Sequence, residues 1–429
     1  MVSNAQNAIC KPEVYESKRI QLTSPMLHIG SEVQKLSPFE YVQTSNRVYL
    51  PNQQALAKAL AQRGKLQDYI SRIEDRQEIT TLLESTFGEN WSTQKTANDE
   101  LIFPETGISR KWTEEKITDF RPMIRNGFGY RYIPGSSIKG AIRTALAYYL
   151  LKHEEDYRVP LSIPFSSRVS EIESRLRNSM GEIKRNAKFT DDRLFMNDIF
   201  SKFSLFYQDK RALGKTSLPN TDFMRAVRVT DAEPFVETHK KTKQGKTVVF
   251  NLPVAVEVMV SSRYPDFKAK HRAPIYVEMV RNIHTAFTLS INSAMLSWFR
   301  HNQNMKIPFT NIYELLNICQ EFARDQWEAE QFYWQNIQNN LNAGGKNLEF
   351  STIRSLYSQE CAYSLRIGWA SGMLGTTVNL CFDEELVEEI RDTCGSPAPD
   401  YEAPKSRRTV VDPNGEIKFV PGWVKFKVL

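Results

Sequence analysis

The stretch that decides the expected fold reads IPGSSIKGAIRTAL and spans residues 133–146. Just before it, the aromatic and β-prone residues Phe128–Ile133 predict a strand, and Pro134–Ser137 predict the turn that ends this strand. Apolar residues then recur at helical spacing from Ile138 to about His153, which predicts an amphipathic helix. The stretch therefore indicates a strand, a tight turn and a helix in immediate succession.

The start of this helix has the composition of a phosphate site. The window Arg121–Lys152 contains six Lys or Arg residues and no Asp or Glu. Lys139 and Arg143 share one helix face, close to the free N–H groups at the positive end of the helix dipole. Gly135 lets a backbone approach, and Ser136 or Ser137 can cap the helix or donate to phosphate oxygens. The alternative is a capped turn with two solvated cations, and the lack of acids favours phosphate.

Two further segments flank this stretch. On the N-terminal side, Lys18–Ser24 predicts a strand that leads into His28 and Gly30. On the C-terminal side, Phe223–Thr230 and Val248–Val260 predict strands. The basic loop between them, which carries Lys240, Lys241 and Lys243, predicts a hairpin tip that either is simply solvated or grips a nucleic-acid strand.

Farther along the chain, the patterns predict long helices over Ile275–Arg300 and Asn311–Asn342, and strands over Glu360–Ile367 and Glu416–Val428. The order of elements predicts an α+β fold with an antiparallel sheet and large helical insertions. The expected segments are the first part of the core (15–52), a helical insertion (53–120), a core strand with the helix quoted above (121–160), a second helical insertion (161–220), core strands with the basic hairpin (221–262), a helical segment (263–350) and a C-terminal core with a glycine-rich loop and the last strand (351–429).

The glycine-rich loop is a second candidate for contact with nucleic acid. Gly368, Gly372 and Gly375 leave room for an RNA backbone to pass without obstruction by side chains. Trp369 within the loop is as consistent with a core residue as with a stacking platform, and Arg366 just ahead of it is a candidate phosphate contact. Glycines at this spacing also occur in ordinary turns, and neither a P-loop nor a dinucleotide fingerprint is present.

The amino-acid composition indicates the class of protein. The chain has 429 residues, 41% of them hydrophobic and 25% charged, as expected of a soluble globular protein. The net charge of +6 is unremarkable for this length. Neither a membrane-spanning apolar run nor a signal peptide is evident, so we expect a cytoplasmic protein without a membrane partner. Five cysteines without a CxxC pair favour neither a disulfide framework nor a zinc site.

Signals for catalysis are poor. None of the six histidines has metal-ligand spacing, so we expect neither metal nor cofactor. His28, next to Gly30, can serve as the general base of a metal-independent ribonuclease. A structural or RNA-contacting histidine is the interpretation we favour, and with it a protein that is not an enzyme.

Taken together, these motifs resemble a known family. Residues 133–146, His28–Gly30 and the loop Leu365–Thr377 are similar to the motifs of the RAMP superfamily of CRISPR-associated proteins. The ending, Pro404–Arg408 followed by Gly422–Lys425, resembles the close of one subfamily, the subunit at the 3′ end of the guide RNA in type III-A (Csm) effector complexes.

The resemblance implies a ferredoxin-like (RRM-like) core of the Cas7 type. It implies that the chain binds crRNA and target RNA beside a backbone RAMP subunit and a small subunit, caps the guide's 3′ end and is needed for crRNA maturation, with host nucleases recruited. No catalytic aspartate can be placed, because Asp231 does not lie in a comparable loop. Alternatives are an endoribonuclease that processes the crRNA precursor and a backbone or cap subunit of a different type III complex. The predicted RNA-binding residues are His28, Gly30, Arg125, Arg131, Gly135, Ser136, Ser137, Lys139, Arg143, Lys240, Lys241, Lys243, Arg366, Gly368, Trp369, Gly372, Gly375, Lys405, Arg407 and Arg408.

Overall fold

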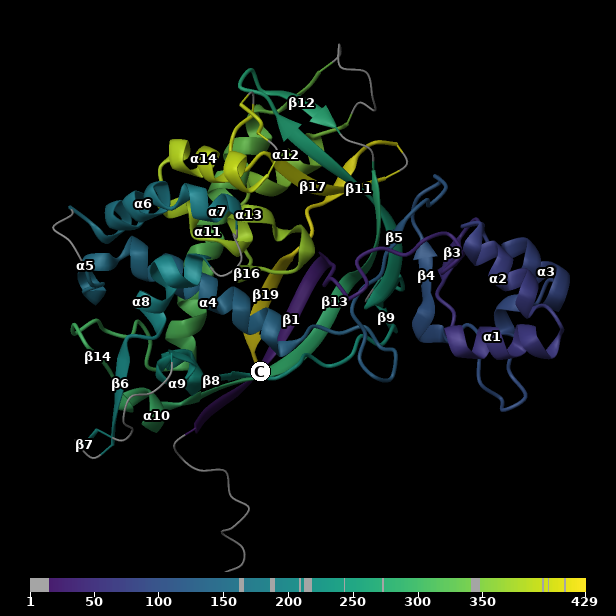
Figure 1. The fold of residues 1–429 in the computed structure, drawn as a ribbon, viewed down its shortest axis with the longest axis horizontal. Coiled ribbons are helices and arrows are strands. Elements are labelled where there is room, and N and C mark those ends of the chain that lie inside the picture. The colour runs from purple at the N-terminus through teal and green to yellow at the C-terminus, as the bar shows by residue number, and fades with distance from the viewer. Residues whose placement is uncertain are drawn as a thin grey trace, which may run out of the picture.

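A large mixed sheet with helices packed against it organises the molecule (Figure 1). The computed structural model describes residues 15–161, 166–185, 190–207, 210–211, 218–242, 244–271, 274–340, 348–395, 397–399, 401–412 and 414–429. Within these ranges fourteen strands join the sheet, whose main path runs β16-β19-β1-β13-β11-β4-β3-β2. The predicted α+β class is therefore confirmed.

Six elements form the centre in the chain order strand, helix, strand, strand, helix, strand. They are β1 (Tyr15–Leu27), α4 (Gly135–Lys152), β11 (Leu252–Arg263), β13 (Ile275–Asn292), α11 (Ile312–Asn336) and β19 (Trp423–Val428). In space the four strands lie in the order β19-β1-β13-β11, and every neighbouring pair is antiparallel. The predicted antiparallel arrangement holds for this centre, whereas β4 (Ile108–Lys111) and β5 (Phe120–Arg121) join it in parallel.

One hydrophobic core joins the two long helices to one face of the central strands. Ile20 and Leu22 of β1, Ile142 of α4 and Leu315 of α11 all lie in it without exposed surface. Burying such a side chain contributes about 1.5–3 kcal/mol, so this layer supplies much of the stability. The opposite face of β1 and β19 stays polar: Lys425 and Lys427 are exposed, while Phe426 and Val428, at the alternate positions of β19, pack on the core.

A separate lobe carries the first helices, α1 (Gln53–Gln62), α2 (Leu66–Glu74) and α3 (Thr80–Phe87) (Figure 1). These helices have their own core around Leu56, Leu60 and Trp91. The short strands β2 (Val42–Gln43) and β3 (Arg47–Tyr49) join the lobe to the sheet through β4.

The middle of the chain adds a second helical region beside α4. It comprises α5 (Glu154–Tyr157), α6 (Arg168–Asn178), α7 (Met180–Arg185), α8 (Asn197–Phe200), β6 (Phe203–Tyr207), β7 (Lys210–Arg211), α9 (Leu218–Thr221), α10 (Ser293–Trp298) and β14 (Phe299–His301). Strands β14, β6 and β7 form a small sheet of their own.

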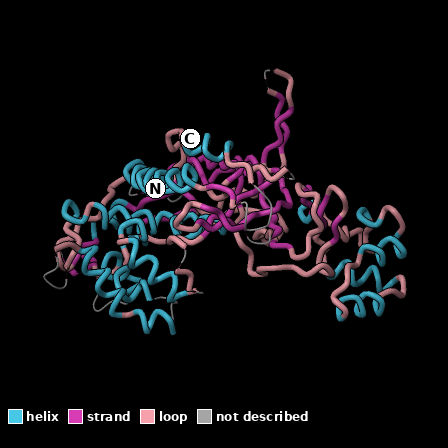
Figure 2. Tube along the Cα trace, turned by 90° about the horizontal axis from the view of Figure 1, so that it is seen from above, coloured by secondary structure: helices cyan, strands magenta, loops and turns pink. Residues whose placement is uncertain are grey.

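The remaining elements are three helices and short strands that pair with the sheet. They are β8 (Val227–Val229), β12 (Lys268–His271), β15 (Gln338–Asn339), α12 (Ser351–Tyr357), β16 (Leu365–Arg366), α13 (Gly372–Thr376), α14 (Glu384–Cys394), β17 (Ser406–Val411) and β18 (Ile417–Phe419). A two-stranded arm, β9 (Thr238–Lys241) with β10 (Thr247–Phe250), projects from the body (Figure 2). Among the described residues, no helix combines the length and apolar character needed to cross a membrane.

The largest correction concerns residues 275–300. The predicted helix is wrong: the chain forms the 18-residue strand β13, with only the short helix α10 at its end. Consequently the segment 263–350 is not uniformly helical. The signal was present, because Ile283, Phe287, Leu289 and Ile291 occupy alternate positions and are buried, which is the period of a strand.

Several shorter predictions also need correction. Residues 128–133 form a turn with one isolated bridge, Arg125 to Arg131, rather than a strand. The predicted strand 248–260 is divided at Asn251, whose φ of 53° ends β10 before β11 begins. Residues 223–226 form a 3-10 helix ahead of β8, because Asp222 caps it. Only Leu365–Arg366 of the strand predicted over 360–367 pairs with a neighbour, β19.

Candidate nucleic-acid interface

The N-terminus of α4 is already satisfied from within the chain. The helix begins at Gly135 after Pro134, so the prediction that Ser136 or Ser137 caps it is wrong. The Gly135 N–H donates to Asp231 Oδ1 at 2.7 Å. A Cβ at Gly135 would lie 2.5 Å from the Val229 carbonyl oxygen, so glycine is needed here for packing against β8. Since a carboxylate takes the place of the phosphate, this helix end is not an open anion site.

Lys139 and Arg143 share one helix face, and both are half-buried with internal partners. Lys139 Nζ donates to the Val227 carbonyl oxygen at 2.8 Å, and burial lowers the pKa of this ammonium. Arg143 pairs with Asp222 at 2.5 Å, and its guanidinium lies 3.8 Å from the centre of the Phe200 ring. The acids that the window 121–152 lacks are thus supplied by Asp222, Asp231 and Glu278 from later in the chain.

Arg125 and Arg131 are held by a buried carboxylate of β13. Glu278 has no exposed surface; its Oε1 lies 2.7 Å from both guanidiniums, and its Oε2 accepts the Met123 N–H. Burial by itself raises the pKa of Glu278, but the two arginines lower it well below its usual range. These two cations therefore anchor the segment ahead of α4 to the sheet.

His28 lies at the end of β1 with only 3% of its surface exposed. Its Nδ1 lies 2.7 Å from the Glu278 carbonyl oxygen, and because a carbonyl can only accept, Nδ1 carries a proton. Burial lowers the pKa of this histidine to about 4. Its ring meets the edge of Trp369 at 5.7 Å, so His28 supports the glycine-rich loop from beneath.

The glycine-rich loop packs tightly on the end of β1. Gly368 has a φ of 88°, and a Cβ there would lie 2.4 Å from the His28 carbonyl oxygen, so only glycine fits. Gly375 is similarly close to Ser371, whereas Gly372 has open space around it, and the neighbouring Gly30 is exposed. The loop's close approach therefore serves its own packing, and its open side lies at Gly372.

Two guanidiniums enclose Trp369 on this open side. The guanidinium carbon of Arg121 lies 5.5 Å, and that of Arg408 4.5 Å, from the centre of the Trp369 ring, and Arg408 donates to the Trp369 carbonyl oxygen. Burial, followed by repulsion from Arg121, lowers the pKa of Arg408. Within the described part of the chain neither guanidinium has a carboxylate partner. We call Arg121, Trp369 and Arg408 the arginine clamp; Arg121 was missed as a site residue because nothing local marks it.

The other predicted cations near the C-terminus are structural. Arg366 and Arg407 are buried, and each has a nitrogen 3.0 Å from Oε1 of the fully buried Glu330. Burial by itself raises the pKa of Glu330, but the two arginines lower it by more, so the pKa lies below its usual value. Lys405 is half-buried with its ammonium 4.6 Å from the Tyr401 ring.

The β9–β10 arm presents its cations to solvent on a hairpin, as predicted, although Lys240 and Lys241 lie in strand β9 rather than in the loop at its tip. Lys240 and Lys241 are exposed, and Lys243 lies outside the described residues. Asn282 of β13 donates to the Val249 carbonyl oxygen at 3.1 Å and so braces the arm's base. Arg121 pairs with Val277 of the same strand, β13. Val277 and Asn282 are five residues apart, so the base of the arm and Arg121 are separated by roughly 17 Å along β13.

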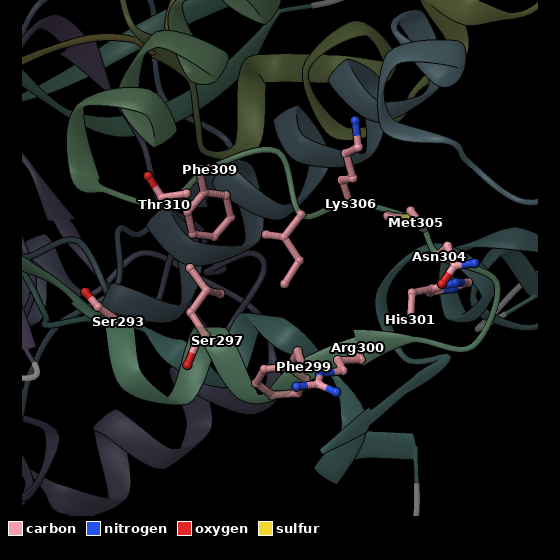
Figure 3. A pocket seen from close by; sticks show the side chains of 12 residues that line it. Ser293, Ser297, Phe299, Arg300, His301, Asn304, Met305, Lys306, Phe309 and Thr310 are labelled. Carbon is pink, nitrogen blue, oxygen red and sulfur yellow. The ribbon is translucent and has the colours of Figure 1, made fainter. Parts of the chain in front are cut away.

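One sizeable cavity lies away from all of these residues. It measures about 560 Å³ and is bordered by α10, β14 and the following loop, with Phe299 and Phe309 on facing walls (Figure 3). His301 at one end is buried, and burial lowers its pKa. The lining includes none of the predicted RNA-binding residues.

The fold and the motifs together define a class of protein. The family model of the RAMP superfamily matches residues 19–354, so the chain belongs to this superfamily, as the resemblance predicted. It is also similar to the CRISPR system Cms protein Csm5 of Enterococcus italicus, with 26% identity over 151 residues. That match spans 31% of this chain and 43% of the relative, which is less than half of the relative's length.

Two solved structures share the fold over nearly the whole chain. One is a chain of a cryo-EM structure of a Csm–crRNA–target RNA ternary complex from a type III-A CRISPR-Cas system, with a TM-score of 0.58. The other is the crystal structure of Csm5 from T. onnurineus, with a TM-score of 0.54. Each is 19% identical in sequence and covers 96% of this chain and 100% of the solved one. The chain is thus a RAMP superfamily protein that resembles Csm5 of the type III-A Csm complex.

Proposed function

We propose that this chain is the RNA-binding subunit of a type III-A CRISPR (Csm) effector complex that binds the 3′ region of crRNA. In this role it caps the filament of backbone RAMP subunits in the cytoplasm, contacts the small subunit and target RNA, and is required for crRNA maturation by recruited host nucleases. The observation that carries the proposal is the similarity to Csm5 within a RAMP superfamily chain.

The geometry of the core supports a ferredoxin-like, Cas7-type assignment. A βαββαβ unit of this kind places its fourth strand beside the first and its third between the first and second. The order β19-β1-β13-β11 has that arrangement, with α4 and α11 on one face.

The distribution of charge supports RNA as the ligand. The base of the β9–β10 arm, whose lysines are exposed, and Arg121 of the arginine clamp both lie beside strand β13. In the described part of the chain, the clamp guanidiniums have no carboxylate partner. Phosphates attract such cations, and an RNA strand that runs from one to the other would contact both.

The burial of His28 supports a role without catalysis. A general base must reach its substrate and bind a proton near neutral pH. His28 is 3% exposed and its pKa is lowered to about 4, so it meets neither requirement in this conformation.

Co-expression with the other Csm subunits and a CRISPR array tests the proposal. We expect the chain to co-purify with crRNA, and complexes made without it to carry crRNAs with longer, unprocessed 3′ ends on sequencing. The isolated protein should leave repeat RNA intact in EDTA. Mature crRNA ends in its absence would contradict the role in maturation. Cleavage by the isolated protein that disappears with His28→Ala would contradict the proposal and favour the endoribonuclease.

A further inference from the structure

One aromatic side chain is displayed to solvent to an unusual degree. Phe128 is 86% exposed, the highest value among the large exposed hydrophobic side chains of the described residues, and Tyr130 beside it is 40% exposed. Contact of a phenyl ring with water is unfavourable, so a ligand that covered this ring would gain the free energy of its burial.

The turn that carries Phe128 is firmly braced. Asn126 Oδ1 accepts the N–H groups of Phe128 and Tyr130, each at 3.0 Å, and the Gly129 N–H donates to the Asn126 carbonyl oxygen at 2.9 Å. Gly129 has a φ of 83°, and a Cβ there would lie 2.8 Å from Thr106 Oγ1. The ring is therefore presented by a preformed turn, and little conformational entropy is lost when it is covered.

Both ends of the turn are fixed to the sheet beside the base of the β9–β10 arm. Arg131 donates to the Ile108 carbonyl oxygen and pairs with the buried Glu278. The Phe235 N–H donates to the Arg131 carbonyl oxygen at 2.8 Å, and the chain enters β9 three residues later, at Thr238. The turn that carries the ring thus ends next to the segment that leads into the exposed lysines of the arm.

We propose that Phe128 is a stacking platform for one unpaired base of the RNA whose phosphates the β9–β10 arm binds. The proposal rests on the proposed function and names the part of the RNA that this turn contacts. A base needs one exposed aromatic face, and stacking of this kind does not depend on base identity. A docked protein subunit needs roughly 800 Å² on this surface, whereas one phenyl ring supplies about 150–250 Å².

The test compares Phe128→Ala with Phe128→Trp in the full-length chain. Binding of fluorescein-labelled single-stranded oligoadenylate is measured by anisotropy over a range of salt, beside an abasic oligomer with the same backbone. We expect Phe128→Ala to weaken oligoadenylate binding about 10-fold. Its salt slope and its affinity for the abasic oligomer should stay unchanged, and Phe128→Trp should restore binding. Phe332→Ala is the matched control, because Phe332 is 59% exposed on α11, away from the arm.

Three results would overturn the proposal, and they differ from one another. Equal binding of oligoadenylate by wild type and Phe128→Ala would remove the stacking role while leaving RNA binding in place. Equal loss for oligoadenylate and the abasic oligomer would show that Phe128 acts on the backbone or on the turn. A wild-type chain that binds neither oligomer would remove the proposed function as well.

Discussion

Two sets of cations in this molecule look alike in the sequence and behave in opposite ways in the structure. Arg125 and Arg131 converge on Glu278 inside the protein, whereas Lys240 and Lys241 extend into solvent on a projecting arm. Arg366 and Arg407 repeat the first pattern around Glu330. A basic residue near a family motif therefore serves the fold or the ligand according to whether a carboxylate from elsewhere in the chain reaches it.

Removing the buried carboxylate should have the largest effect. Glu278→Gln leaves two guanidiniums without an anion in a buried site, and we expect the free energy of unfolding to fall by about 3–5 kcal/mol. Urea denaturation of the isolated chain measures this loss. Glu233→Gln is the matched control, because its pair with Arg19 is more than half exposed and should contribute about 1 kcal/mol or less. Similar losses of unfolding free energy in both variants would show that the buried and the exposed ion pairs stabilise the fold equally.

The same buried region should make stability depend on pH. The pKa of His28 is about 4 in the folded chain against 6.5 without burial, so below about pH 6.5 the unfolded chain binds a proton that the folded chain does not. Stability should therefore fall as the pH falls through this window, by about 3 kcal/mol in total from His28. Burial also lowers the pKa of His301, which adds to the loss in the same direction.

Urea titrations at intervals across this window check the prediction. His28→Asn removes the titrating ring and can still donate to the Glu278 carbonyl oxygen, so its stability should depend less steeply on pH. Glu278, whose pKa is lowered, adds its own loss only below about pH 4.5, after the His28 window. A variant with the full wild-type slope would show that His28 is not the responsible group.

Substitution of the exposed lysines of the arm should have the smallest effect on stability and a clear effect on RNA binding. Lys240→Gln with Lys241→Gln should change the free energy of unfolding by less than about 0.5 kcal/mol. On single-stranded RNA the double variant should lower the salt slope by about 1–2 units, because fewer counterions are released. Lys58→Gln with Lys184→Gln, two exposed lysines on α1 and α7, is the control. An unchanged slope would remove the arm from the interface.

Much of the fold could be predicted where the pattern is local. The helix predicted from Ile138 to about His153, the long helix α11 and the basic hairpin are all present close to where they were expected. The strand β13 was mistaken for a helix because residues 276–280, near its start, are buried without interruption, which hides the alternation seen from Ile283 onward. The candidate site was predicted less well: Trp369 and Arg408 come together with Arg121, but Lys139, Arg143 and Arg366 have internal partners.

The sequence by itself determined the superfamily, the α+β class and the position of the motif helix, since each depends on residues that are neighbours along the chain. Only the tertiary structure decided which cations are available to a ligand. Asp222, Asp231, Glu278 and Glu330 lie far along the chain from the cations and the N–H group that they contact, and an electrostatic interaction depends on distance in space. Local composition around Lys139 and Arg143 showed no acids, and folding brought one to within 2.5 Å of Arg143.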